Sequence, residues 1–221
     1  MKKFALVLSF LSVAAAVSVR AESIVFNNLT GTSFTENAYT VGQDGNETWS
    51  VDNSFTLHAT GTINEVMAGV WVPTGSTLSS VDAGFYGAPF AQGTVYASGG
   101  ISPVSATLKA TNVNGWDIYA EYFVISPITL GPGTYYLDFL SAITFNGSTN
   151  GSTAGWDWSS NPNNSADQWN NQGDDISGLT ATTFVLYGSG GNSTVPEPSS
   201  LLLLGSGAAA LFGALRRRVK A

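Results

Sequence analysis

Residues 52–59 read Asp-Asn-Ser-Phe-Thr-Leu-His-Ala, and their character alternates at every second position. Phe55 and Leu57 fall on one side of an extended chain, whereas Asp52 and Thr56 fall on the other. Successive side chains of a β-strand point to opposite faces of the sheet, so this period of two predicts a strand with one buried face. The fold is therefore expected to be built from β-sheet.

The same alternation recurs along most of residues 22–187. Further strands are expected at positions 23–27, 63–72, 77–85, 94–97, 104–111, 116–125, 134–140 and 181–187. Turn-forming pairs such as Asp44-Gly45 and Asn114-Gly115 separate these segments, and none of them follows the 3.6-residue period of a helix. About nine or ten short strands at this spacing predict an all-β domain, an antiparallel two-sheet sandwich of jelly-roll-like or Greek-key type. A closed barrel is the second choice.

Residues 146–179 interrupt the alternation and are rich in Asn, Gly, Ser and Asp, so we expect a long loop of the kind that often carries function. It holds Trp156, Asp157, Trp158 and Trp169. Indole rings stack on sugar faces and carboxylates accept hydrogen bonds from hydroxyl groups, which makes this loop a candidate glycan-binding site. The other interpretation, which we favour, is that the tryptophans fold back over a sheet edge, because large aromatic side chains supply much of the burial in a small core.

Charge is distributed unevenly along the 221 residues, whose net charge is −7. Residues 22–195 hold 14 acidic residues and one basic residue, Lys109, whereas both ends are basic. One lysine cannot neutralise a phosphate backbone, so a nucleic-acid binder is excluded. The chain has no cysteine and a single histidine, His58, which excludes disulfides, thiolate zinc sites and multi-histidine metal sites. We expect no metal site and no cofactor.

The first 21 residues have the three parts of a secretory signal peptide. Lys2 and Lys3 precede an apolar run, and the sequence Val-Arg-Ala at residues 19–21 fits the small-x-small cleavage rule. Cleavage is expected after Ala21, followed by export of the rest of the chain.

Residues 195–221 combine a short motif, an apolar run and a basic tail. The motif is Pro196, Glu197 and Pro198, and the basic tail holds Arg216, Arg217, Arg218 and Lys220. Residues 198–215 carry no charge and are near the lower length limit for a transmembrane helix, and the tail at 216–220 is expected in the cytoplasm. Residues 188–194, rich in glycine and serine, predict a flexible linker before this segment.

In this order the three parts resemble the PEP-CTERM sorting domain of Gram-negative bacteria, a segment also called the ice-binding protein C-terminal domain. The resemblance implies processing by an exosortase, a membrane cysteine transpeptidase, after delivery by the secretion machinery. It implies that the Pro-Glu-Pro triplet is the recognition motif and that the three arginines are a cytoplasmic stop signal. It also implies a transient inner-membrane anchor, then a place on the cell surface or in an exopolysaccharide or biofilm matrix. An ordinary C-terminal anchor is the alternative.

The exported body is also similar, more loosely, to a domain common among PEP-CTERM proteins. The similarity lies in residues 55–72 and 115–124, in Gly-Thr-Tyr-Tyr at 133–136, in the Trp-Asp segment at 155–158 and in the final apolar strand at 183–188. It implies no catalytic residues.

Two pairs of carboxylates are the nearest candidates for glycoside hydrolysis, which needs two acids on opposite sides of a bond. They are Asp117 with Glu121 and Asp174 with Asp175, and neither pair lies in a recognisable motif. The expected function is therefore an exported, non-enzymatic surface or matrix protein. A carbohydrate-binding module that uses residues 146–179 is the alternative, and an extracellular glycoside hydrolase is less favoured.

Overall fold

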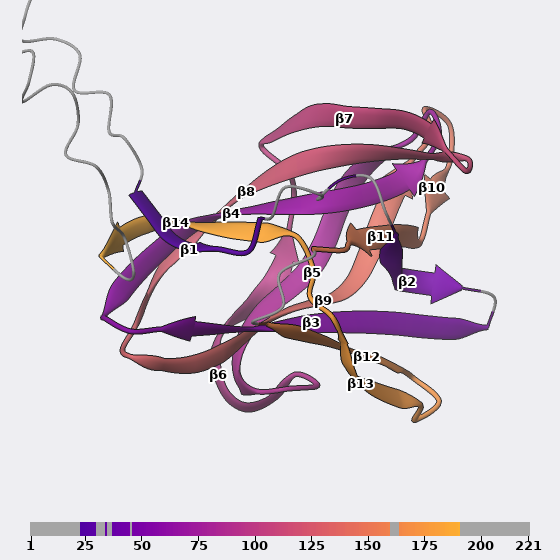
Figure 1. Cartoon of the computed structure of the whole chain (residues 1–221). Coiled ribbons are helices and arrows are strands. Elements are labelled where there is room, and N and C mark those ends of the chain that lie inside the picture. Colours follow the sequence, from indigo (N-terminus) through magenta and orange to yellow (C-terminus); the bar gives the residue numbers. More distant parts are fainter. Residues whose placement is uncertain (1–22, 30–33, 35–36, 45, 160–163, 191–221) are drawn as a thin grey trace, which may run out of the picture. The chain divides into compact units, whose positions relative to one another are not determined.

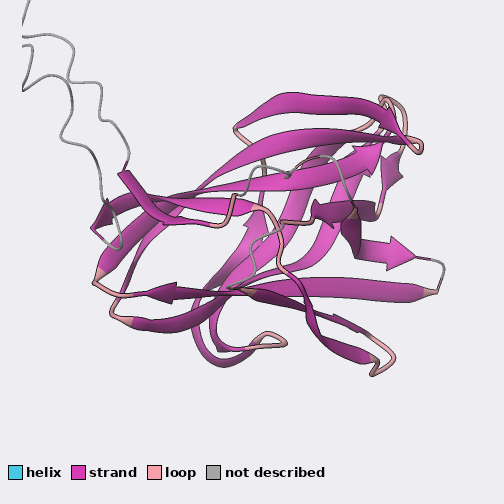
Figure 2. Cartoon of the chain, viewed as in Figure 1, coloured by secondary structure: helices cyan, strands magenta, loops and turns pink. Residues whose placement is uncertain are grey.

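Fourteen strands and their connecting loops make up the described part of the chain (Figure 1). In this computed structural model the described residues are 23–29, 34, 37–44, 46–159 and 164–190, and Figure 2 shows no helix among them. The strands are β1 (Ser23–Asn27), β2 (Ala38–Asp44), β3 (Glu47–Leu57), β4 (Gly61–Pro73), β5 (Thr77–Ala88), β6 (Gln92–Ile101), β7 (Ser105–Val113), β8 (Trp116–Leu130), β9 (Gly133–Phe145), β10 (Asn150–Gly151), β11 (Thr153–Asp157), β12 (Ser165–Asn170), β13 (Asp175–Thr180) and β14 (Phe184–Gly190).

The all-β prediction is confirmed, and each segment with clear alternation contains a strand. The prediction of a long loop at residues 146–179 is wrong, because this stretch holds β10, β11, β12 and β13. Their backbones pair with β9, with β2 and β4, with β3, and with one another. Backbone pairing needs no apolar side chain, so the polar composition of this stretch concealed its strands.

The strands form two facing halves that are joined along one side (Figure 1). One half has the order β1-β14-β4-β8-β7, and the other has the order β13-β12-β3-β9-β5-β6. Strand β11 pairs with β4 and also with β2, and β2 pairs with β3, so all pairs belong to one antiparallel sheet. The expected sandwich of two separate sheets is thus a single continuous sheet that folds over its own core.

The first and last strands of the described chain are neighbours. Ser23 at the start of β1 lies opposite Gly188 near the end of β14. Residues 188–190, the first part of the expected linker, pair with residues 61–63 of β4. The expected signal peptide at 1–21, the remaining linker at 191–194 and the whole sorting segment at 195–221 lie outside the described residues. Among the described residues there is no helix with the length and apolarity needed to cross a bilayer.

Phe55 lies at the centre of the core and contacts aromatic rings from both halves. Its ring centroid is 5.4 Å from that of Phe26, 6.1 Å from Phe85, 5.7 Å from Tyr135 and 6.2 Å from Phe184. The alternation of β3 places Phe55 inward, and its side chain is fully buried. Buried aromatic rings contribute both apolar area and favourable ring geometry, which matters in a chain without disulfides.

Gly42 occupies the place where the sheet passes from one half to the other. It pairs with Thr153 of β11 on one side and with Trp49 of β3 on the other. Its φ is +98°, and a Cβ atom added there would lie 2.0 Å from the carbonyl oxygen of Ser152. Only glycine fits both the backbone conformation and this close approach.

We predict that Gly42→Ala lowers the free energy of unfolding by about 3 kcal/mol or more, because it adds a clash with backbone to the cost of a positive φ. Gly75 is the matched control, since its φ is +79° and its added Cβ would meet no atom within 4 Å. Gly75→Ala should cost about 1 kcal/mol. Urea unfolding followed by circular dichroism measures both values, and equal losses would contradict the role given to Gly42.

Candidate functional site

Trp156, the first candidate glycan-binding residue, lies in the core. Its side chain is fully buried and stacks on Phe139 of β9, with ring centroids 4.2 Å apart and planes inclined by 21°. Its indole Nε1–H donates to the carbonyl oxygen of Thr183 at 3.0 Å. Trp156 is therefore a residue of the packed core, which agrees with the structural interpretation favoured from the sequence over glycan binding.

Asp157 is the centre of a buried hydrogen-bond network. Its carboxylate accepts hydrogen bonds from Trp71 Nε1–H at 2.6 Å, from Thr183 Oγ1–H at 2.9 Å and from the backbone N–H of Phe34 at 2.7 Å. These donors come from β4, from the segment before β14 and from the segment before β2, so one carboxylate ties three parts of the chain together. A fully buried carboxylate with this set of donors has a structural role in the fold.

Trp158 and Trp169 lie apart from Trp156 and differ in their surroundings. Trp158 is partly buried, and its ring lies 5.1 Å from the ring of Tyr39. Trp169 of β12 is also partly buried, and its ring meets that of Phe90 edge to face at 5.6 Å. Strand register puts Trp169 opposite Ser50 and two residues beyond Asp167, on the outer face of β12. Only Trp169 therefore combines an outer face with a neighbouring carboxylate.

Three aspartates that the sequence analysis did not single out form a row across neighbouring strands of this outer face. Asp167 of β12 lies opposite Asp52 of β3, and Asp52 lies opposite Asp138 of β9. Directly opposite residues have Cβ atoms about 4.5–5.5 Å apart, so the three carboxyl groups are close neighbours. We call Asp167, Asp52 and Asp138 the acidic row.

The tip of the β5–β6 hairpin covers the acidic row. The backbone N–H of Phe90 donates to Asp52 Oδ2 at 2.7 Å, and the Phe90 ring reaches Trp169. Tyr86 is buried beside Gly84, which lies opposite Asp138. Gly84 leaves room for the Tyr86 ring, because a Cβ atom on Gly84 would lie 2.4 Å from that ring. As a result, Asp52 and Asp138 are fully buried although they lie on the face away from the main core.

Burial leaves the two covered carboxyl groups poorly solvated. Among the described residues only one oxygen of Asp52 accepts a hydrogen bond of normal geometry, whereas its other oxygen and both oxygens of Asp138 do not. Burial raises the pKa of Asp138 to about 9; the charge of Asp52 adds to this shift, and the backbone N–H of Ala91 opposes it. Burial also raises the pKa of Asp52 to about 7, which the Phe90 N–H opposes and the charge of Asp167 reinforces. At neutral pH Asp138 therefore holds its proton, whereas Asp52 is close to its midpoint.

The carboxylate pairs considered for glycoside hydrolysis do not converge on one site. Asp117 accepts backbone hydrogen bonds from Asn112 at 2.8 Å and Gly75 at 3.1 Å, which hold its pKa below the usual range and fix two turns. Glu121 is buried four residues further along β8, about 13 Å away at the rise of a strand, and burial raises its pKa to about 7. Asp174 accepts a hydrogen bond from Asn170, and Asp175 is exposed.

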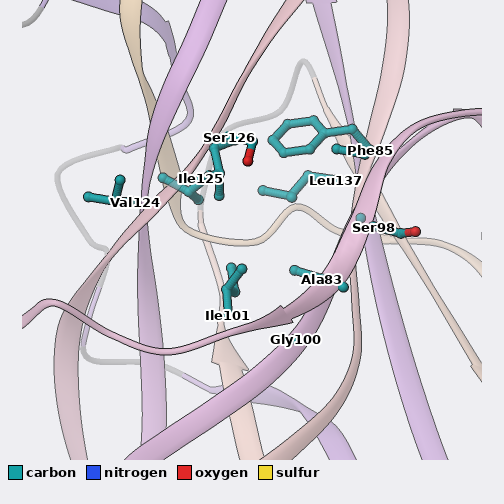
Figure 3. Close-up of a pocket in the computed structure, with 13 residues that line it drawn as sticks. Ala83, Phe85, Ser98, Gly100, Ile101, Val124, Ile125, Ser126 and Leu137 are labelled. Atoms are coloured by element: carbon teal, nitrogen blue, oxygen red, sulfur yellow. The ribbon is translucent and has the colours of Figure 1, made fainter.

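A cavity of about 290 Å³ lies beside β6 and β8 (Figure 3). Phe85, Leu137, Ile101 and Ile125 form apolar parts of its wall, and no charged residue lines it. An acid or base for catalysis is therefore absent from this lining. The described residues also hold no group of three acidic, histidine or cysteine side chains that could bind a metal ion.

Comparison with known proteins identifies the C-terminal segment. The family model described as "PEP-CTERM protein-sorting motif" matches residues 194–218, which include the Pro-Glu-Pro triplet and the three arginines. Comparison of the chain with curated proteins and with solved structures gave no match. The chain thus carries this sorting motif, at residues outside the described part of the structure.

We predict that Asp157→Ala lowers the free energy of unfolding by about 3 kcal/mol or more, because it leaves the Trp71 indole and the Phe34 amide without their acceptor. Asp174→Ala is the control, since it removes an exposed carboxylate and should cost less than about 1 kcal/mol. Thermal and urea unfolding of both variants would measure the difference. Similar losses would show that the Asp157 network is not a main support of the fold.

Proposed function

We propose that the chain is the precursor of a non-enzymatic protein of the bacterial cell surface or extracellular matrix, which an exosortase sorts. The observation that carries this proposal is the PEP-CTERM motif at residues 194–218. The motif fits a secreted protein with a C-terminal, membrane-anchored sorting signal. The strongly acidic body, which holds a single lysine, suits a place outside the cytoplasm and away from nucleic acid.

Each part of the sorting segment has a role in this proposal. Pro196, Glu197 and Pro198 are recognised by the exosortase, residues 198–215 anchor the precursor transiently in the inner membrane of a Gram-negative cell, and the three arginines stay in the cytoplasm. After processing, the body is released to the surface or to an exopolysaccharide or biofilm matrix. A body of net charge −13 repels other acidic polymers, so its contacts with a matrix involve neutral sugars or bridging cations.

The absence of an enzymatic activity is part of the proposal. It is supported by the engagement of Asp117, whose carboxylate accepts the backbone N–H groups of Asn112 and Gly75 and so fixes two turns. It is also supported by the burial of Asp52 and Asp138, because a substrate cannot reach fully buried carboxyl groups.

We predict that replacing Pro196, Glu197 and Pro198 together by alanine makes the unprocessed precursor accumulate in the membrane fraction. Wild-type chain should be processed and released, which immunoblotting of cell fractions and the intact mass of the released protein would measure. The control replaces Gly191, Asn192 and Ser193 by alanine, three positions just before the matched motif, and should be processed normally. Normal processing of the Pro-Glu-Pro variant would overturn the proposal.

Binding of a matrix glycan is the second candidate function, and one observation favours it at Trp169. This residue pairs with Phe90 and shares the outer face of β12 with Asp167, so an aromatic ring and a carboxylate lie together. Of the tryptophans considered from the sequence, Trp156 is fully buried and Trp158 packs on Tyr39. The glycan-binding hypothesis is therefore best placed on Trp169.

We predict that, if the body binds matrix polysaccharide, Trp169→Ala weakens retention about tenfold, a typical effect of one lost stacking contact. Trp116→Ala is the control, because Trp116 is also partly buried but belongs to β8 in the other half of the sheet. Pull-down on purified exopolysaccharide measures retention, and circular dichroism verifies the fold of both variants. Equal retention by wild type and Trp169→Ala would eliminate this site.

A further inference from the structure

We infer that the tip of the β5–β6 hairpin is a pH-dependent cover, which stays closed on Asp52 and Asp138 of the acidic row while these two residues hold protons and opens as the protons are lost. The tip consists of Ala88 to Gln92, and the row consists of Asp167, Asp52 and Asp138. This conformational device is independent of the sorting function proposed above.

Few contacts hold the tip against the row. The Phe90 N–H donates to Asp52 Oδ2 at 2.7 Å, and the Phe90 ring packs edge to face on Trp169. Beneath the tip, both oxygens of Asp138 and Asp52 Oδ1 are buried without a hydrogen-bond partner. Closure thus removes two carboxyl groups from water and gives back one hydrogen bond of normal geometry and the nearby N–H of Ala91, an arrangement that is tolerable for neutral acids and costly for charged ones.

No cation lies among the described residues that face the row. On β12 Asp167 accepts the backbone N–H of Gly178, on β9 the neighbour is Tyr136, and on β5 it is Tyr86. The tip itself contributes only uncharged residues. Lys109, the single lysine of the body, lies 5.5 Å from the centre of the Phe34 ring. Within this part of the chain, protons are therefore what can neutralise the two buried acids, Asp52 and Asp138.

The tip also has a backbone that favours opening. Phe90 and Ala91 are consecutive non-glycine residues with φ of +60° and +53°. L-residues rarely adopt this left-handed conformation, and the surrounding contacts have to maintain it. When Asp52 and Asp138 become charged and these contacts weaken, the strain of the tip adds to the tendency to open.

The direction of the pH effect follows from the two states of the acids. In the open tip the carboxyl groups are solvated and have an ordinary pKa near 4, whereas in the closed tip the pKa is about 7 for Asp52 and about 9 for Asp138. Closing therefore takes up protons. As pH rises from about 4 to about 9, the equilibrium constant for closing falls by up to about tenfold per pH unit for each proton that closing takes up. Above a pH of about 9 this constant no longer changes.

Hydrogen–deuterium exchange of the full chain in mild detergent, measured by mass spectrometry at pH 5, 7 and 9, tests this inference. After correction for intrinsic exchange, protection of a peptide that spans residues 88–92 should fall at least about tenfold between pH 5 and pH 9. A peptide from the centre of β4 should keep its protection. Constant protection of the tip, or equal loss in both peptides, would overturn the inference.

Two substitutions test whether the pH dependence of the tip comes from the acidic row or from other acids. Asp138→Asn keeps the shape of the side chain but cannot ionise, so it should reduce the pH-dependent loss of exchange protection at the tip at least about threefold. Asp52→Asn gives the same readout if Asp138→Asn does not fold. Glu121→Gln is the matched control, because Glu121 is a buried acid of raised pKa outside the row, and it should leave the pH dependence of the tip unchanged. A wild-type pH dependence in the row variants would contradict the role of these aspartates.

Discussion

Strand β11 is the connection on which the rest of the fold depends. It hydrogen-bonds to β4 of one half and to β2, the neighbour of β3, in the other half. Its two side chains at the join act in different ways: Trp156 stacks on Phe139 inside the core, and Asp157 accepts the indole N–H of Trp71. The chain has no cysteine, so no disulfide can take over this function. The closure of the sheet therefore relies on apolar packing and on a few buried hydrogen bonds.

Alternation in the sequence was sufficient to predict the strands whose one face is covered by the core, such as β3 around Phe55. It could not reveal β11, because the strand contains Gly155 and Asp157 and owes its burial to partners on both sides. The same limit applies to the pairing order. A period of two says which residues share a face, but the join through Gly42 depends on a close backbone approach that has no signature in local composition.

The candidate site, like the fold, could be predicted from the sequence only in part. Alternation correctly placed Asp52 on the polar side of its strand, yet Asp52 and its neighbour Asp138 are both buried, because a hairpin from another part of the sequence lies over them. The tryptophans drew attention to residues 146–179, where Trp156 proves to be a core residue and Trp169 remains on an outer face. A usable signal was present in the charge count: 14 acidic residues with one lysine cannot all be paired with a cation, so a buried acid needs hydrogen-bond donors, as Asp157 has, or holds a proton.

The pairing of β1 with β14 has a consequence for how the body is presented. Ser23 and Gly188 face each other across neighbouring strands, so the described chain enters and leaves the domain at one pole. A tether fixed at this pole would hold the domain at a single point. Any tether there, whether lipid, polysaccharide or polypeptide, would leave the remaining surface free to rotate and to meet neighbours in all orientations, and removing a flanking segment at that pole would cut no other strand of the sheet.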